Sequence, residues 1–295
     1  MNRFTILSKI IKGVIFTFSF MIGFSSCHHH DLFVYDESFS KGENTEFSSE
    51  EEDGNTKIKA GSTIGVYVID QDGNVTFRTV EVDEHGNAVL PAVPDGTGFV
   101  AYLPYQEDWN QEDVVSPKIF TVQPSQTTQE LYDASDLMFG SKGVRSRASS
   151  QFTFRHALSK IIVEITDETE AYNLSESVLT LLDMNDTVEV FLKWLIVETL
   201  SEYSHDIITY NYKTEGQTTF FTAIAAPQTL KSGVSFINLT ANGRQLAFNL
   251  PGKEDLQSGK TFTCSLRLTD IGLIYDGSSI SDWEDDGGDS FDMEW

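Results

Sequence analysis

Thr63-Ile-Gly-Val-Tyr-Val-Ile69 and Val75-Thr-Phe-Arg-Thr-Val-Glu-Val82 are rich in β-branched and aromatic residues, and the turn sequence Asp70-Gln-Asp-Gly-Asn74 separates them. Such residues at period two, interrupted by Gly, Asn and Asp, are typical of antiparallel strands joined by tight turns. A second turn sequence, Asp83-Glu-His-Gly-Asn87, leads into Ala88-Val-Leu90. The sequence therefore predicts a β-meander over 63–90.

The same pattern recurs along the rest of the chain, and it predicts strands at 97–103, 118–122, 152–165, 177–182, 207–212, 218–225, 234–240, 245–250 and 261–268. Helical spacing is clearest at 186–200, where Val188, Phe191, Leu192 and Leu195 recur near a period of 3.6. We expect a helix there, although the β-branched residues of this segment leave a strand open.

Between 123 and 150 the composition shifts to Ser, Thr, Gln and Gly, which favours a boundary between domains. Each flanking half holds enough short strands for an antiparallel sandwich. We therefore expect an all-β protein with two tandem antiparallel β-sandwich domains, an N-terminal one at 44–148 and a C-terminal one at 149–283, followed by an acidic tail at 284–295.

The N-terminus has the pattern of a bacterial lipoprotein signal. Basic residues precede an apolar run that ends in Phe20-Met-Ile-Gly-Phe-Ser-Ser-Cys27, and the run is shorter than a membrane-spanning helix requires. We expect residues 1–26 to be removed, Cys27 to carry lipid, and 27–43 to form a tether. An ordinary cleaved signal or a short anchor, with Cys27 as a buried thiol, is the alternative. With Cys27 lipidated only Cys264 remains, so no intrachain disulfide can form.

The chain is strongly acidic, with 20 Lys and Arg against 45 Asp and Glu and a formal net charge of −25. A surface of this charge repels nucleic acid and anionic lipid. We expect no nucleic-acid partner and contact with the membrane only through the lipid on Cys27.

Residues that could carry chemistry are few, and the sequence predicts no enzyme activity, cofactor or metal site. His28-His-His30 could bind a transition metal, but adjacent histidines in a tether have no preset geometry. His156 falls in an alternating strand, where we expect a packed or hydrogen-bonded ring, and Cys264 is expected to be a buried thiol. The turn at 70–74 and the tail sequence at 285–289 lack the further ligands of a calcium loop.

Eight short segments, taken in order, give the chain a family likeness. They are Phe47-Ser-Ser49, Ala60-Gly-Ser-Thr-Ile-Gly-Val-Tyr67, Ala101-Tyr-Leu-Pro-Tyr105, Asp136-Leu-Met138, Phe152-Thr-Phe-Arg-His-Ala-Leu-Ser-Lys-Ile161, Ala225-Ala-Pro-Gln228, Ser258-Gly-Lys260 and Ile280-Ser-Asp-Trp283. Over roughly 40–283 the chain resembles the fimbrillin-like lipoproteins of Bacteroidales, the pilins of type V, or Mfa-like, pili. The resemblance implies that the sandwiches are transthyretin-like and that the protein is exported as an outer-membrane lipoprotein. It also implies assembly with other pilin subunits into adhesive pili, which form the fimbrium at the cell surface.

In that family, as the resemblance implies, a trypsin-like protease removes an N-terminal strand, and a C-terminal strand of the next subunit fills the groove. The candidate first strand here is Leu32-Phe-Val-Tyr35 or Thr45-Glu-Phe47, and the first basic residue after Cys27 is Lys41. Arg145-Ser-Arg147 is the other accessible basic site. Since no Arg lies between Cys27 and Arg78, this chain departs from a pattern that requires cleavage after Arg.

The tail alternates only at Phe291, Met293 and Trp295, which makes either a short donor strand or a frayed acidic end. A subunit without a donor could sit at a pilus tip, and one that keeps its first strand could be an anchor. Asp186-Thr-Val188 resembles an O-glycosylation sequence of this bacterial group, which makes Thr187 a candidate for modification.

Two other classes of function compete with the pilin interpretation. A monomeric outer-membrane surface lipoprotein could bind glycan or a host protein through an exposed aromatic such as Trp109, unless that ring packs in its own sandwich. A surface hydrolase needs only two carboxylates, which spacing cannot exclude in so acidic a chain.

Overall fold

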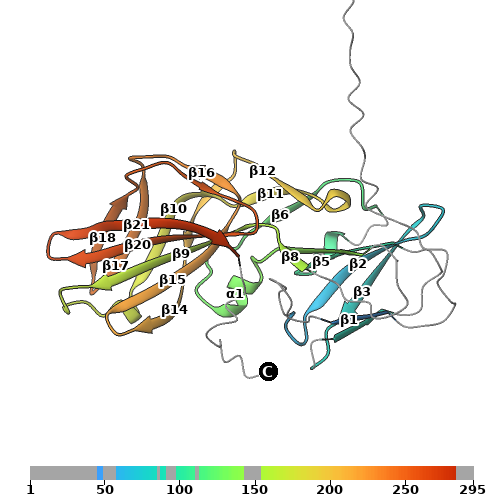
Figure 1. Ribbon diagram of the computed structural model, residues 1–295, viewed down its shortest axis with the longest axis horizontal. Helices are drawn as coiled ribbons and strands as arrows, with labels where there is room; N and C mark the ends of the chain where they lie inside the picture. The colour runs from blue at the N-terminus through green and yellow to red at the C-terminus, as the bar shows by residue number, and fades with distance from the viewer. Residues whose placement is uncertain are drawn as a thin grey trace, which may run out of the picture. The chain divides into compact units, whose positions relative to one another are not determined.

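The computed structural model describes residues 45–48, 58–84, 87–90, 98–109, 113–142 and 154–283, with the backbone alone at 45–48, 87–90 and 142. All of these residues belong to one compact unit, Leu32–Trp295. The fold is all-β, as predicted, and its sheets are almost entirely antiparallel (Figure 1). Of the helices in the described residues, none combines the length and hydropathy of a membrane span.

The first half of the chain contributes strands β1 (Thr45–Ser48), β2 (Thr63–Ile69), β3 (Val75–Glu81), β4 (Asn87–Leu90), β5 (Gly98–Leu103), β6 (Lys118–Thr121), β7 (Met138–Lys142) and β8 (Phe154–His156), with helices η1 (Glu107–Trp109) and α1 (Gln129–Asp133).

The second half contributes strands β9 (Ser159–Asp167), β10 (Val178–Asn185), β11 (Thr187–Phe191), β12 (Ile196–Thr199), β13 (Ser204–Ile208), β14 (Tyr210–Glu215), β15 (Thr218–Ala225), β16 (Gln228–Leu230), β17 (Ser235–Ala241), β18 (Arg244–Asn249), β19 (Glu254–Leu256), β20 (Lys260–Thr269) and β21 (Gly272–Asp282), with η2 (Leu174–Glu176) and η3 (Leu192–Trp194).

The main sheet of the first half has the order β3-β2-β5-β7-β8 and is buried on both faces. On one face, side chains such as Ile64, Val66 and Phe99 form a small apolar cluster. On the other face Tyr67 and Tyr102 pack with Trp109 of η1, and the Tyr67 hydroxyl donates to the Trp109 carbonyl. Burial on both faces explains why β2 and β5 read as near-continuous apolar runs.

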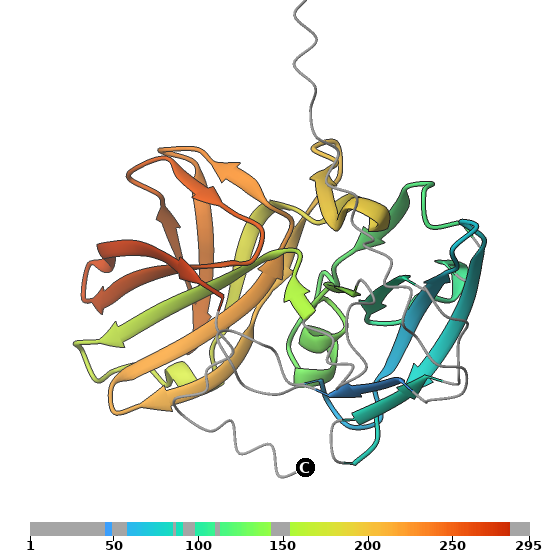
Figure 2. The same cartoon turned by 45° about the vertical axis from the view of Figure 1, so that its right-hand side comes forward.

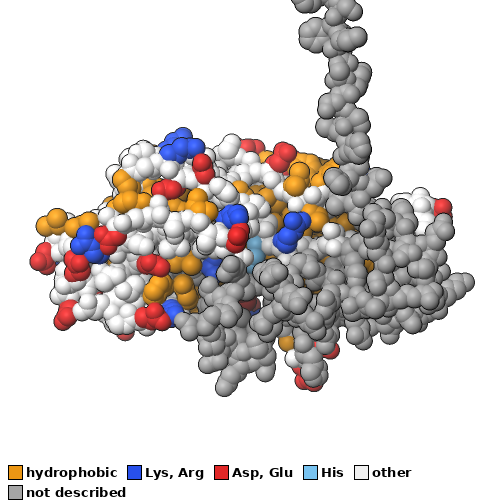
Figure 3. Space-filling view, viewed as in Figure 1, with side chains coloured by type: hydrophobic (Ala, Val, Ile, Leu, Met, Phe, Trp, Pro, Cys, Tyr) orange, Lys and Arg blue, Asp and Glu red, His pale blue; other side chains and the backbone are white. Residues whose placement is uncertain are grey.

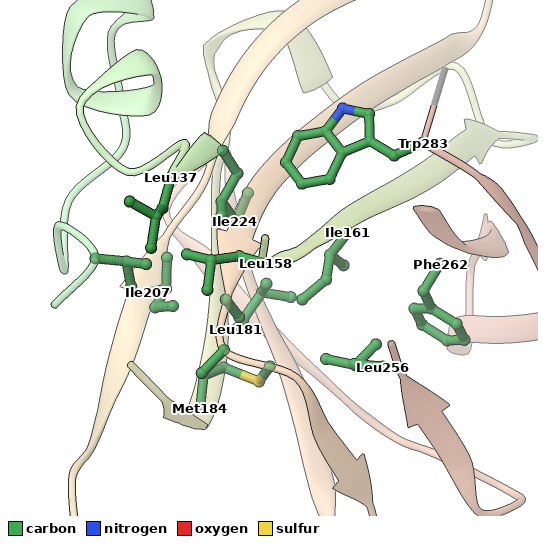
Figure 4. Close-up of a cluster of buried hydrophobic side chains, with 14 of the residues drawn as sticks. Leu137, Leu158, Ile161, Leu181, Met184, Ile207, Ile224, Leu256, Phe262 and Trp283 are labelled. Atoms are coloured by element: carbon green, nitrogen blue, oxygen red, sulfur yellow. The ribbon is translucent and has the colours of Figure 1, made fainter. Parts of the chain in front are cut away.

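Two layers make the sandwich of the second half, one with the order β14-β15-β9-β20-β21 and one with the order β13-β10-β17-β18 (Figure 2). Their inner faces share one apolar core, in which Phe236 meets Phe262 edge to face with ring centroids 6.3 Å apart. Strands β9 and β20 pair in parallel, so the sheet is mixed rather than purely antiparallel as expected. Figure 4 shows side chains from both layers and from the first half in this core, including Leu137, Leu181 and Phe262.

A small sheet, β12-β11-β6, joins the halves because β6 of the first pairs with β11 of the second. The helix expected at 186–200 is wrong. The segment forms the hairpin of β11 and β12, and Leu195 at the turn takes a left-handed φ of 54°. Its apolar residues match helical spacing, but β-branched residues pair well across strands, and that preference prevails here.

The segment between the halves is packed rather than a free linker. Gln126 is 0% exposed, and its side-chain amide both donates to the carbonyl of Ile224, at 2.8 Å, and accepts from the N–H of Ile224, at 2.8 Å. Strand β14 pairs with β15 only as far as Thr222. The amide of Gln126 therefore supplies the partner that β15 would otherwise lack in the core.

Two further expectations need correction. The meander over 63–90 is broken, since β4 pairs with β1 while β2 takes β5 as its second neighbour. The expected linker contains α1 and β7, and β8, which lies after the expected boundary, pairs with β7. The two-domain division at 148 stays a prediction.

Gly65 lies opposite Tyr102 in the β2–β5 pair, and a Cβ on it would stand 2.3 Å from the Tyr102 ring. We expect Gly65→Ala to lower the free energy of unfolding by about 1–3 kcal/mol, because the packed core must shift to admit the methyl group. Urea denaturation measures the loss. Gly252→Ala, whose Cβ meets nothing within 4 Å, is the matched control. Equal stability of the two variants would contradict the close approach.

Removing the amide of Gln126 leaves the buried N–H and C=O of Ile224 without their partner. We expect Gln126→Ala to lower the free energy of unfolding by about 2–6 kcal/mol, since each of the two unmet buried groups costs about 1–3 kcal/mol. The exposed Gln245→Ala serves as control and should cost less than about 0.5 kcal/mol. A Gln126→Ala variant as stable as the control would show that the amide bond contributes nothing.

Candidate functional site

Sequence segments that are far apart along the chain meet at the end of β21. The imidazole of His156 on β8 stacks on the indole of Trp283, with ring centroids 3.8 Å apart and planes 1° from parallel. Asp136, which follows α1, bonds to the edge of this ring, because its Oδ1 lies 2.8 Å from His156 Nδ1. Trp283 is 7% exposed and His156 8% exposed. We call these three residues, with Lys160 of β9 at 6.0 Å from the indole centroid, the Trp283 joint.

Backbone bonds fix the same region. The Trp283 N–H donates to the carbonyl of Gly259, and the Gly259 N–H donates to that of Leu158. Gly259 has a φ of +67°, in the left-handed region that glycine tolerates best. The Ser258 hydroxyl donates to the Ala157 carbonyl at 2.7 Å. Figure 4 shows Trp283 beside Ile224, Ile161 and Leu158, at one border of the shared core.

The contacts of the Trp283 joint suit a role in stabilising the fold rather than in proton transfer. Its imidazole is enclosed between a carboxylate and an indole, so a substrate has little access to it. The expected packed and hydrogen-bonded His156 is confirmed. Asp136 and Trp283 belong to two of the eight family-like segments. Neither the pattern nor the spacing of the sequence shows that both side chains contact His156.

The chain leaves the described region directly after Trp283. The candidate donor residues Phe291, Met293 and Trp295 lie outside the described residues, as do the candidate lipidation site Cys27 and the candidate cleavage site Lys41.

Strands β21 and β1 are among the outer strands of the described sheets. Strand β21 is the outer member of its sheet and runs for 11 residues. Strand β1 is four residues long and pairs with β4 in a two-stranded sheet. Unpaired edges of this kind accept strands from other chains.

The other candidate residues have structural surroundings. Trp109 is 1% exposed among Tyr102 and Phe120, which confirms the alternative that its ring packs in its own sandwich and removes it as a candidate platform for a glycan. Cys264 is 0% exposed, which confirms the expected buried thiol. Burial raises the pKa of this thiol to about 12, and the charges of Glu254 and Glu164 act in the same direction.

Thr187 lies in β11 and is 5% exposed. Its hydroxyl donates to Asp186 and lies 3.0 Å from the Thr121 hydroxyl on β6. Glycosylation of Thr187 stays a prediction, and a glycan would have to be attached before β11 joins its sheet.

The turn at 70–74 is a hairpin turn, as expected. Asp70 accepts hydrogen bonds from the N–H groups of Asp72 and Asn74 and from the Asn74 amide, and these bonds hold the pKa of its carboxyl below the usual value. Among the described residues no group of three or more His, Cys, Asp or Glu is placed to hold a metal ion.

Charges on the sandwich surface are mixed despite the acidic composition. Figure 3 shows Lys and Arg side chains next to Asp and Glu on the face in view. Arg267 on β20, for example, bonds to Asp276 at 2.7 Å and to Glu168 at 3.1 Å. Exposed pairs of this kind contribute little to stability.

Comparison with known proteins agrees with this architecture. A profile of the family described as fimbrillin-like matches residues 51–283, a range that contains all four residues of the Trp283 joint. The comparison with curated proteins found no match.

Solved structures similar to this chain include two described as putative cell adhesion proteins. One, from Bacteroides ovatus, has a TM-score of 0.63 at 15% identity, covering 83% of this chain and 99% of its own. The other, from Bacteroides uniformis, has a TM-score of 0.60 at 18% identity, covering 81% and 97%. The tip fimbrial protein Mfa3 from Porphyromonas gingivalis, with a C-terminal truncation, has a TM-score of 0.53 at 10% identity, covering 82% and 100%. At these identities the likeness shows the fold.

We expect His156 and Trp283 to stabilise each other. Alanine at Trp283 should cost about 3–5 kcal/mol of unfolding free energy. The double variant with His156→Ala should show a coupling of about 0.5–1.5 kcal/mol, as for other ring pairs. Urea denaturation of the four proteins measures it.

His205→Ala combined with Trp283→Ala is the control, because His205 bonds to Asp186 on another part of the surface. That pair should be additive. A zero coupling between His156 and Trp283 would mean that the stack adds nothing beyond separate burial.

Proposed function

The chain belongs to the fimbrillin-like family, and we propose that it is a structural subunit of adhesive cell-surface pili, anchored through lipid on Cys27. The observation that carries the proposal is the family match over 51–283, which spans both halves of the fold and the joint between β8 and the end of β21. The same membership favours a structural role over the alternative of a surface hydrolase.

We propose that subunits assemble by strand complementation at β4. Strand β1 covers β4 through only four residue pairs, Thr45↔Leu90 to Ser48↔Asn87. So short a ladder is readily replaced by a longer strand from another subunit, because main-chain hydrogen bonds add up with length. The donor is the tail at 284–295, with Phe291, Met293 and Trp295 on one face.

The position of β1 decides which proteolytic cleavage would expose β4. Lys41 precedes Thr45, so cleavage after Lys41 releases Leu32–Tyr35 and leaves β1 attached to the protein. Cleavage after Lys57 or Lys59 would detach β1 from β2. Trimming at these two places therefore has different structural consequences: only the second frees β4.

We expect limited trypsin digestion of the chain from residue 28 onward to yield SDS-resistant oligomers once β1 is released, with mass spectrometry identifying the new N-terminus. Lys41→Ala and the double variant Lys57→Ala with Lys59→Ala separate the two cleavages. Oligomers that vanish only in the double variant support replacement of β1. If oligomers are lost only with Lys41→Ala, the strand that the donor replaces is Leu32–Tyr35 and not β1.

If light scattering shows that the protein stays monomeric after each cleavage has been verified, the polymerising role is overturned. Deletion of 284–295 is the complementary test. It should abolish oligomers and leave the thermal unfolding of the monomer unchanged, since the deletion begins after Trp283.

A further inference from the structure

A cavity of about 270 Å³ opens where β9 ends, at the end of the strand opposite its junction with β8. Three segments line it: the end of β9 with the loop that leads into η2, the β14–β15 turn, and the start of β15. The lining residues are Asp167, Glu170, Tyr172, Asn173, Leu174, Ser175, Thr214, Gly216, Gln217 and Thr219.

The wall formed by the loop after β9 is held in place by a buried carboxylate. Asp167 is 4% exposed and accepts hydrogen bonds from the N–H and hydroxyl of Thr169 and from the N–H of Tyr172. Burial alone would raise the pKa of Asp167, but these bonds outweigh it and hold the pKa below the usual value. The carboxylate is therefore ionised at neutral pH, and the loop is ordered before any ligand arrives.

Neighbouring elements brace the same loop from outside. Asn242, in the β17–β18 turn, donates to the Ala171 carbonyl at 2.8 Å. Arg244 donates to the Tyr172 hydroxyl at 2.6 Å, with its guanidinium 5.8 Å from the ring centroid. Asn211 on β14 donates to the Ser175 carbonyl at 2.9 Å. Preorganised walls reduce the entropy that a ligand must overcome on binding.

The lining chemistry selects among classes of ligand. Glu170, Gln217, Asn173, Ser175 and Thr214 supply carboxylate, amide and hydroxyl groups to the lining. Some of these groups bond to one another: the Gln217 amide donates to Glu170 at 2.7 Å, the Ser175 hydroxyl donates to the Asn173 amide oxygen at 2.6 Å, and the Thr214 and Thr219 hydroxyls lie 3.1 Å apart. Their second amide N–H groups and further lone pairs supply both donors and acceptors to a ligand. Two carboxylates and no Lys or Arg occur among these lining residues, so the cavity disfavours phosphate and other anions. Leu174 and Tyr172 are the only large apolar side chains among these lining residues, and Leu174 is 5% exposed, which disfavours a lipid or an aromatic drug-like ligand.

We propose that this cavity binds a neutral sugar residue, such as the terminal unit of a surface glycan. A sugar presents several hydroxyls, each both donor and acceptor, which matches the mixed lining, and its C–H face can pack on Tyr172. The cavity lies just below the range of about 300–1,000 Å³ typical of ligand pockets, which suits one ring rather than a longer chain. The site goes beyond the subunit role, because it does not depend on how subunits assemble.

The test uses the untrimmed monomer from residue 28 onward and saturation-transfer NMR with a panel of free neutral sugars: galactose, glucose, mannose, fucose, N-acetylglucosamine and N-acetylgalactosamine. We expect at least one sugar to bind with a dissociation constant of about 1 mM, and N-acetylneuraminic acid, which is anionic, to bind more weakly. Since the protein is neither cleaved nor polymerised, failure here leaves the pilus role untouched, and failure to polymerise leaves this test untouched.

Matched variants locate the site. Gln217→Ala, in the exposed β14–β15 turn, should weaken binding about tenfold by removing a hydrogen-bonding amide, while Gln245→Ala on β18 should leave it unchanged. Circular dichroism verifies that both remain folded. No binding by any sugar of the panel at about 10 mM, ten times the expected dissociation constant, would overturn the proposal. Equal affinity of the two variants would overturn it as well, by placing the sugar elsewhere.

Discussion

Satisfaction of buried backbone groups is the constraint on which the arrangement of the two halves depends. Strand β15 extends into the core beyond its neighbour β14, and a bare N–H and C=O at Ile224 would oppose folding. The amide of Gln126 meets both groups at once. Because Gln126 comes from the segment between β6 and α1, the bond that completes one sheet also fixes the path of the chain between the halves. The Trp283 joint also connects the two halves. There the His156 ring bonds to Asp136 and stacks on Trp283 at the end of β21.

Much of the strand content could be predicted because alternation is local. Strands β2 and β15 have the bounds that the sequence predicts, and several others differ by one to three residues. The single strands expected at 152–165 and 207–212 are wrong, because each range holds parts of two strands that belong to different sheets, β8 and β9 in the first and β13 and β14 in the second. Strand β21 was missed, since Gly, Asp and Ser dominate its sequence and its edge position demands little burial. The hairpin at 187–199 was mistaken for a helix because apolar spacing alone cannot register the partner strand β6.

The candidate site was harder to predict than the strands because its contacts are not local. The family likeness identified the segments around Asp136, His156 and Trp283, but only the fold shows that they converge on one ring. Gln126 gave no signal, since a glutamine in a polar stretch looks like solvent-exposed linker until its amide meets a strand end. The sequence left Trp109 open between an exposed platform and a packed ring, because its neighbours Glu107 and Asp108 are typical of a surface while the ring itself is buried. The cavity beside Asp167 is made by three segments that no single stretch of sequence reveals.

The parallel pairing of β9 with β20 has a consequence for when the chain can fold. Strand β9 lies at the centre of its sheet between β15 and β20, yet residues that face each other in the β9–β20 pair, such as Glu164 and Ser265, are 101 positions apart in sequence. During synthesis from the N-terminus, one edge of β9 therefore lacks its partner strand until about a hundred further residues have been made. Contacts of such long range slow folding. Until β20 is made, the sheet that contains β9 lacks both β20 and β21, so it stays incomplete through most of the synthesis of the second half.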